Sequence, residues 1–161
     1  MIKSIQAFFS TYIRQPEQDD GVVGDVRALR LATAALFMEI ARADFEISAQ
    51  ERSRVLNLLR EQFDIDETQA GDLAALGEQQ INEHSSLYPF TRLINDAFST
   101  EEKQTIVENL WRIAYTDKDL HKYEEHLVRR ISDLLYIPHS QMIRAKHRVL
   151  DELENDGSVP S

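Results

Sequence analysis

The chain has 161 residues, a length that one hydrophobic core usually serves, and its 42% hydrophobic and 29% charged residues lie close to globular averages. It contains no cysteine, which excludes disulfides, thiolate zinc sites and a cysteine nucleophile. The formal net charge of −10 would repel phosphate backbones, so we expect no nucleic-acid partner.

The first segment has apolar residues at the spacing of an amphipathic helix that ends before Pro16. These residues are Ile2, Ile5, Phe8, Phe9, Tyr12 and Ile13. Polar residues interrupt the apolar run from Lys3 onward, so we expect neither a signal peptide nor direct membrane insertion. Residues 15–24 are a linker by composition. We therefore predict an N-terminal helix and linker over residues 1–24, packed on its own domain or on a second copy in a homodimer, or extended as a mobile arm.

The apolar pattern becomes continuous from Asp25 and predicts further helices. Their expected ranges are 25–44, 48–63, 66–81, 90–97, 99–114, 122–135 and 138–153. The pairs Ser48 with Glu51 and Ser99 with Glu102 have the spacing of capping boxes, and Gly and Pro are few. We predict an all-α bundle of seven to eight helices with its main domain over residues 25–153, followed by a disordered acidic tail over 154–161.

The sequence contains an internal duplication. A shift of 73 residues, from Asp44 to Asp117, also places Glu51 on Glu124 and Val55 on Val128. With a one-residue slip, Ile65 then corresponds to Ile137. Each copy has an apolar helix that ends in an acidic loop, followed by a glutamate in the next helix. Two pseudo-symmetric helix-loop-helix repeats that bury their apolar faces against each other are the expected arrangement.

The duplicated pattern Asp-x-(Asp/Glu)-(Ile/Leu)-x-x-x-Glu resembles the TerB-like family, which is associated with tellurite resistance, and the TerB-like domain of DjlA-type membrane co-chaperones. The resemblance covers residues 25–150 and is most specific over 91–137. It implies an all-helical bundle linked to stress phenotypes, with no attached enzymatic activity and with acidic loops proposed to bind divalent metal. By position, the implied ligands are Asp44, Glu46, Glu51, Asp117, Asp119 and Glu124. The family usually has glycine after the first aspartate, where this chain has Phe45 and Lys118.

Carboxylate clusters suit hard cations such as Ca²⁺, Mg²⁺ or Mn²⁺. A structural role is the alternative, because Glu51 and Glu124 can act as helix caps and the loop acids can be solvated. An EF-hand is excluded, since a loop that opens at Asp44 or Asp117 has neither Gly at its sixth position nor Glu at its twelfth. A ferritin-like di-iron site is excluded because no Glu-x-x-His pair is present.

Three functions remain open. The leading hypothesis is a non-enzymatic, cytoplasmic binding and adaptor module, modulated by a divalent cation, which acts with protein partners, membrane-associated ones included, in a tellurite-type stress response. The second is a metal-dependent enzyme of unknown substrate that uses the acidic loops. The third is a purely structural scaffold. An enzyme would need an acid or base beside the metal ligands, and the sequence offers no convincing one.

Overall fold

The computed structural model describes residues 21–43, 47–116 and 122–155, and this part of the chain is helical without any strand. Its elements are α2 (Gly21–Ala41), α3 (Ala49–Phe63), α4 (Glu67–Glu83), α5 (Tyr88–Ala97), α6 (Thr100–Ala114), α7 (Lys122–Leu134) and α8 (His139–Asn155). The predicted all-α class is confirmed. The predicted N-terminal helix lies outside the described residues, as does the tail beyond Asn155.

Several predicted helix ends differ from those of the structure by a few residues, including the end of α2 at Ala41 and the start of α5 at Tyr88. Helix α2 begins at Gly21, so the last four residues of the expected linker are helical. Once a helix is nucleated, each added residue gains a hydrogen bond, and this offsets a glycine cost of about 1 kcal/mol. Helix α8 continues to Asn155, so the expected tail is helical over its first two residues. Residues 48 and 99 cap helices as predicted, each in a complete capping box.

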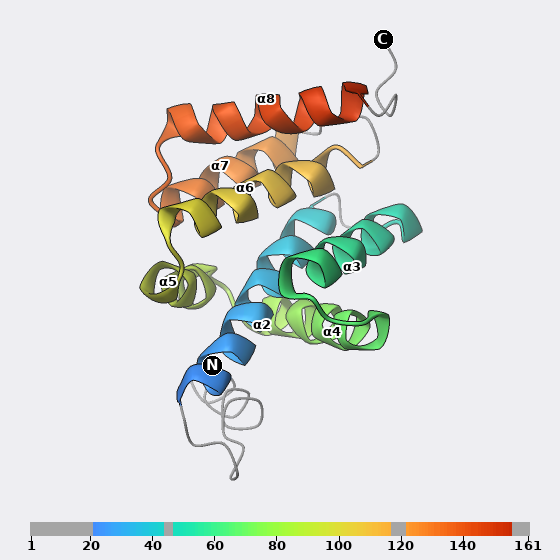
Figure 1. The fold of residues 1–161 in the computed structure, drawn as a ribbon, viewed down its shortest axis with the longest axis vertical. Helices are drawn as coiled ribbons and strands as arrows, with labels where there is room; N and C mark the ends of the chain where they lie inside the picture. The colour runs from blue at the N-terminus through green and yellow to red at the C-terminus, as the bar shows by residue number, and fades with distance from the viewer. Residues whose placement is uncertain (1–20, 44–46, 117–121, 156–161) are drawn as a thin grey trace.

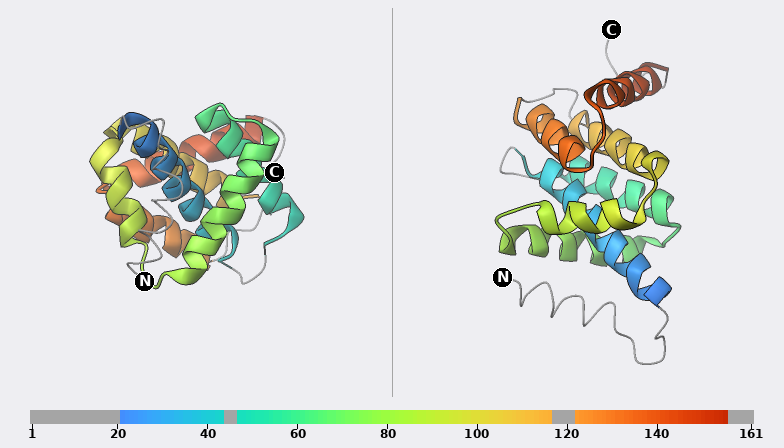
Figure 2. Two further views of the ribbon diagram at one scale, coloured as in Figure 1. Left: turned by 90° about the horizontal axis from the view of Figure 1, so that it is seen from below. Right: turned by 90° about the vertical axis from the view of Figure 1, so that its left-hand side faces the viewer.

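Helix α2 forms the centre of the fold. It runs diagonally through the molecule, with α3 and α4 on one side, α5 on the other, and the layer of α6, α7 and α8 across its C-terminal end (Figure 1). The view from below in Figure 2 shows α2 between α4 and α5. Helix α2 contacts α3, α4, α5, α6 and α7, and its consecutive residues from Ala34 to Met38 are fully buried. This explains why its sequence is apolar on nearly every face.

Small residues join α2 to α4. Ala70, Ala74 and Gly77 of α4 are buried, and a Cβ atom added to Gly77 would lie 2.9 Å from the Ala34 carbonyl carbon and 2.9 Å from the Ala35 nitrogen. Only glycine lets the two backbones approach so closely at this position. The most extensive helix-helix contact of the described chain therefore depends on the absence of a side chain.

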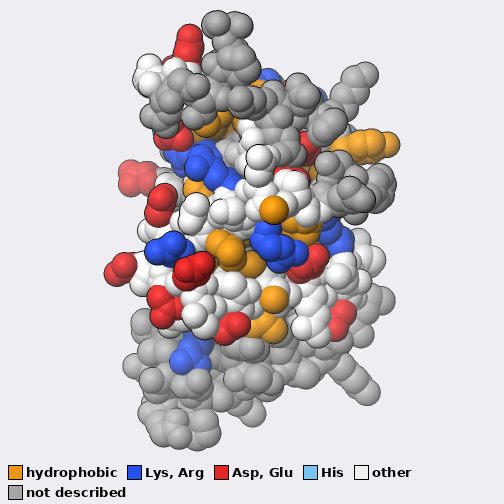
Figure 3. All heavy atoms as spheres, turned by 90° about the vertical axis from the view of Figure 1, so that its right-hand side faces the viewer, with side chains coloured by type: hydrophobic (Ala, Val, Ile, Leu, Met, Phe, Trp, Pro, Cys, Tyr) orange, Lys and Arg blue, Asp and Glu red, His pale blue; other side chains and the backbone are white. Residues whose placement is uncertain are grey.

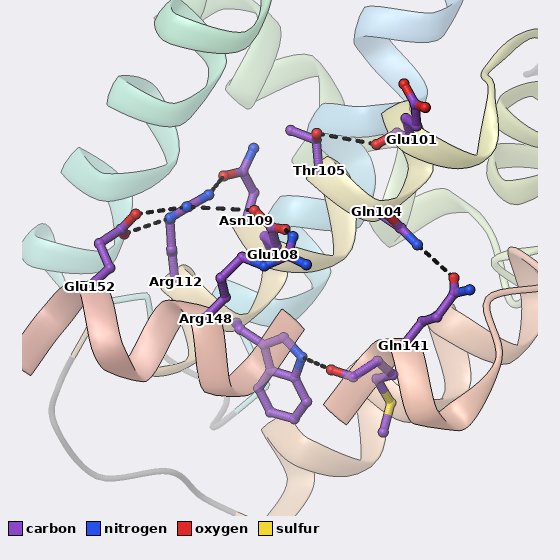
Figure 4. A network of polar contacts seen from close by, with 11 residues as sticks. Glu101, Gln104, Thr105, Glu108, Asn109, Arg112, Gln141, Arg148 and Glu152 are labelled. Carbon is purple, nitrogen blue, oxygen red and sulfur yellow. Dashed lines mark hydrogen bonds and ion pairs between the residues drawn. The ribbon is translucent and has the colours of Figure 1, made fainter. Parts of the chain in front are cut away.

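Larger and polar side chains join α6 to α8 (Figure 4). The Trp111 side chain is fully buried, and its indole nitrogen donates to the Met142 carbonyl at 3.1 Å. Arg112 donates two hydrogen bonds to the Glu152 carboxylate, at 2.8 and 2.9 Å. The Gln104 amide nitrogen donates to Gln141 at 2.6 Å. Side-chain pairs of this kind fix the register of two helices because each partner has a defined position.

Several local features recur at equivalent positions of the two repeats. Asp64, the C-cap of α3, has a φ of 53°, and Tyr136, two residues after α7, has a φ of 59°. Both residues are in the left-handed region. The next amide donates back across the helix end in each copy, from Ile65 to the Arg60 carbonyl and from Ile137 to the Ser132 carbonyl. Such closures are typical of Schellman-type helix ends. Superposition of the two complete repeats stays a prediction.

Charged side chains of both signs are interspersed on the face shown in Figure 3, where apolar side chains form only small separate patches. None of the described helices combines the length and the apolar composition that a membrane span requires.

Candidate functional site

The six predicted ligands divide into two sets. Asp44, Glu46, Asp117 and Asp119 lie outside the described residues. Glu51 and Glu124 are described, and each lies in the first turn of the helix that follows an acidic loop, α3 and α7 respectively. Both glutamates are buried, with relative exposures of 2% and 4%. The two repeats therefore place a buried carboxylate at the same position.

Glu51 belongs to the capping box that starts α3. Its backbone amide donates to the Ser48 hydroxyl oxygen at 3.0 Å, and its carboxylate accepts from the Ser48 amide at 3.1 Å. This arrangement satisfies two amides that the first turn of a helix leaves without partners. The capping box predicted from Ser48 and Glu51 is confirmed. A carboxylate has two oxygens and about four acceptor positions, so capping uses only part of its capacity.

Glu124 occupies the corresponding place in α7, beside Glu125 in the first helical turn. His121, which directly precedes this helix, lies outside the described residues. The N-terminus of a helix favours a negative charge by a few tenths to about 1 kcal/mol, and this contributes to the tolerance of a carboxylate here. Burial of a carboxylate is otherwise costly unless hydrogen bonds or opposite charges compensate for the lost water.

Described residues from both repeats line a hollow of about 390 Å³. Glu39 comes from the last turn of α2, Arg42 and Ala43 from the turn that follows α2, and Leu127 from α7, one turn after Glu124. Arg42 is held by ion pairing with Glu39 at 2.9 Å and by a hydrogen bond to Asn82. The hollow thus lies between the C-terminal end of α2, the first helix of the first repeat, and α7, the second helix of the second repeat.

Tyr115, at the end of α6, lies close to charged side chains of α7 and α8. Burial raises the pKa of the Tyr115 hydroxyl, and the Glu125 carboxylate raises it further. The Lys146 ammonium group lies 3.8 Å from the Glu125 carboxylate and 5.4 Å from the centre of the Trp111 ring. It therefore interacts with both side chains. Oxygen ligands in such surroundings are those that Ca²⁺, Mg²⁺ and Mn²⁺ prefer.

The described residues by themselves do not complete a metal centre, because they contain no group of three or more acidic or histidine side chains arranged to hold an ion. Any such centre has to draw ligands from the four loop acids as well. The buried carboxylates of Glu51 and Glu124 fit a hard cation chemically, since each supplies oxygen donors at the edge of a loop.

Sequence reasoning did not single out Glu39, Arg42 and Leu127, which line the hollow. The i, i+3 spacing of Glu39 and Arg42 at the end of an apolar helix was the available signal for their pairing. The contribution of Leu127 depends on the contact between α2 and α7, which no local pattern specifies.

A protein-family model described as tellurite resistance protein TerB matches residues 30–147. The matched segment contains both acidic loops, both buried glutamates and all of the helices from α3 to α7. No curated protein and no solved structure matches the chain.

Proposed function

The chain belongs to the TerB family, since the family model covers well over half of it, and from this premise we propose that it is a non-enzymatic binding and adaptor module. In this proposal the protein acts in the cytoplasm in a tellurite-type stress response, and a divalent cation at its acidic loops modulates its contacts with protein partners. The observation that carries the proposal is the burial of Glu51 and Glu124 at equivalent positions of the two repeats.

Burial distinguishes these two glutamates from Glu102, a glutamate in the first turn of α6. A helix cap needs no buried carboxylate, because exposed residues serve the same role elsewhere in the chain: Ser99 and Glu102 form an equally complete capping box and are both exposed. Burial at 2% and 4% exposure therefore exceeds what capping requires. A cation at the acidic loops could use the oxygens of these carboxylates alongside the contacts that both glutamates already make.

The residues that would hold a cation are Asp44, Glu46 and Glu51 at the first loop, and Asp117, Asp119 and Glu124 at the second. A bound cation would supply positive charge that neutralises and orders each loop. Three carboxylates leave positions for water, so the affinity should be weak. The first loop should bind more readily, because Lys118 and Lys122 lie among the acids of the second in sequence and like charges repel.

Calorimetric and NMR titrations of the full chain with Ca²⁺, Mg²⁺ and Mn²⁺ test the cation directly. Asp44→Asn with Glu46→Gln should abolish the tighter binding event, and Asp117→Asn with Asp119→Asn should abolish the weaker one. Glu51→Gln is the matched probe of the buried site, because glutamine at this position still completes a capping box. If millimolar cation leaves every spectrum unchanged, the loops are structural and the cation drops out of the proposal.

The adaptor role requires its own experiment. Tagged full-length chain, recovered from native cells with Ca²⁺ or with a chelator, should retain defined partner proteins whose recovery depends on the cation. The variant Asp44→Asn with Glu46→Gln should give the chelator result even when cation is present. Recovery of the same partners from both conditions and from the variant would separate the adaptor role from any cation.

A further inference from the structure

A separate pocket of about 490 Å³ opens between α2, the end of α3 and the start of α6. Its volume lies within the range of small-molecule sites, about 300 to 1,000 Å³. Leu29, Phe63 and Phe98 form apolar walls, and each of them is only partly buried. The walls resemble those of ligand sites, in which apolar surface predominates and a few polar groups fix the orientation of the ligand.

Arg30 contributes a hydrogen-bond donor that has no acceptor. Its Nε atom is buried, and it makes no hydrogen bond within the described part of the chain. The guanidinium group lies over the Phe63 ring at 5.7 Å, which orients its plane but does not satisfy the Nε hydrogen. A buried donor without an acceptor costs roughly 1 to 3 kcal/mol. The Nε atom is too enclosed for a ligand to reach, but the Nη atoms of the same guanidinium group make no hydrogen bond to the described residues and are suited to an acceptor in the pocket.

Gln62 provides a second donor, and a chain of side chains fixes its orientation. Arg112 can only donate, and it donates to the side-chain oxygen Oδ1 of Asn109 at 2.6 Å. The side-chain nitrogen Nδ2 of Asn109 must then donate to the side-chain oxygen Oε1 of Gln62, at 2.9 Å. The side-chain amide nitrogen of Gln62 therefore remains available as a donor, since it makes no hydrogen bond to the described residues. The Gln62 side chain lines the pocket.

We propose that this pocket binds a small apolar carboxylate, with its carboxylate between Arg30 and Gln62 and its apolar body along Leu29, Phe63 and Phe98. The planar guanidinium group of arginine matches a carboxylate better than any other protein donor does. Glu102 also lines the pocket and opposes an anion, but its carboxylate accepts a hydrogen bond from the Ser99 amide at 2.8 Å and is held at the helix cap. This binding is independent of the acidic loops.

The probe is octanoate, titrated into the full chain and followed by NMR, with octan-1-ol as a neutral ligand of the same chain length. Octanoate should shift the resonances of Phe63, Phe98 and the Arg30 Nε group, and should bind more tightly than the alcohol. Arg30→Gln should weaken octanoate binding by about tenfold to a hundredfold, as expected when one charge-assisted hydrogen bond is lost. It should leave the alcohol unaffected.

Two isosteric variants sharpen the test. Gln62→Glu can still accept from Asn109 but loses its amide donor, so octanoate should bind more weakly. Glu102→Gln keeps the capping box and removes the opposing charge, so octanoate should bind more tightly. Equal affinities of wild type and Arg30→Gln for octanoate would overturn the proposal, provided that both melt at the same temperature.

Other occupants of the pocket give different outcomes, and each would also overturn the proposal. If the N-terminal segment fills the pocket, Phe8→Ser with Phe9→Ser should shift the Phe63 and Phe98 resonances without any ligand. If a second copy fills it, Arg30→Gln should change the elution volume of the protein. Both properties should remain unchanged if the pocket serves a small carboxylate.

Discussion

The two repeats join their first and third helices in different ways. In the first repeat, α4 presents Ala70, Ala74 and Gly77 to α2. In the second, a shift of 72 residues, from Ile65 to Ile137, places Met142, Lys146 and Val149 at the same positions of α8. The side chains of Met142 and Val149 are buried against α6 and its neighbours. The first joint relies on close backbone approach, whereas the second fills its space with side chains.

The difference follows from the central position of α2. Five of the described helices contact α2, so α4 has to approach closely to share that crowded surface. Helix α6 has a more open side, where α8 lies as the outermost layer (Figure 2). Because the edge of the α6–α8 interface is exposed to water, it can use partly hydrated ion pairs such as that of Arg112 with Glu152. One helical pattern is thus compatible with two kinds of interface, and the position within the fold decides between them.

The largest effect should come from Gly77→Ala. The added Cβ atom would meet two backbone atoms of α2 at 2.9 Å, and backbone cannot yield as a side chain can. Overpacking of this kind costs about 3 kcal/mol, at the upper end of its usual range. Urea unfolding of the purified variant measures this loss.

Gly71→Ala is the matched control, because it lies in the same helix and a Cβ atom there would meet nothing within 4 Å. It should stabilise the protein by about 0.5 to 1 kcal/mol through helix propensity. If both variants gained stability, α4 would have room to move away from α2 and the close approach would not be required.

Arg112→Met should have the next largest effect, a loss of about 2 kcal/mol. It would remove the partner of Glu152 and leave the acceptor oxygen of the buried Asn109 without a donor. A double-mutant cycle with Glu152→Gln measures how much of the loss belongs to the ion pair. A loss below about 0.5 kcal/mol would mean that water replaces the guanidinium group at little cost, and the second joint would then depend on Trp111 instead.

Local patterns were sufficient to predict most of the fold. Capping boxes at Ser48 and Ser99 and the continuous apolar periodicity set the helix boundaries, because these signals act within a few residues. The close approach at Gly77 was not predicted. A glycine within a helical pattern looks the same whether it faces another backbone, as Gly77 does, or open space, as Gly71 does.

The candidate site was predictable only in part. The duplication identified Glu51 and Glu124 as equivalent, but their burial depends on neighbours from other helices that sequence spacing does not specify. The capping role of Glu51 followed from three-residue spacing with Ser48. The donors Arg30 and Gln62 were not singled out as a pair, since α2 and α3 bring them to one pocket from positions that share no local pattern.

Ser132→Ala should produce a gain of about 1 kcal/mol. The Ser132 hydroxyl is buried without a hydrogen-bond partner in the described structure. Removal of an unsatisfied buried hydroxyl relieves its desolvation cost. Ser53→Ala, at an exposed site within α3, controls for the helix propensity of alanine. Equal gains from the two variants in thermal unfolding would show that the buried hydroxyl carries no penalty.

The smallest effect should be the pH dependence of the second joint. The hydrogen bonds from Arg112 lower the pKa of Glu152 below its ordinary value of 4.5, against the opposing effect of burial. Because the pKa is lower in the folded state, the contribution of the pair is complete above the unfolded value and is lost as the pH falls through the folded one. Glu152 is 41% exposed, so solvent screening limits the contribution to less than about 1 kcal/mol. The difference in unfolding free energy between wild type and Glu152→Gln should therefore be constant near neutral pH and should shrink in acid. The destabilisation by Gly77→Ala, a steric effect, should keep its size over the same range. A difference for Glu152→Gln that persisted at pH 2 would mean that packing of the glutamate stem, rather than its charge, holds α8 to α6.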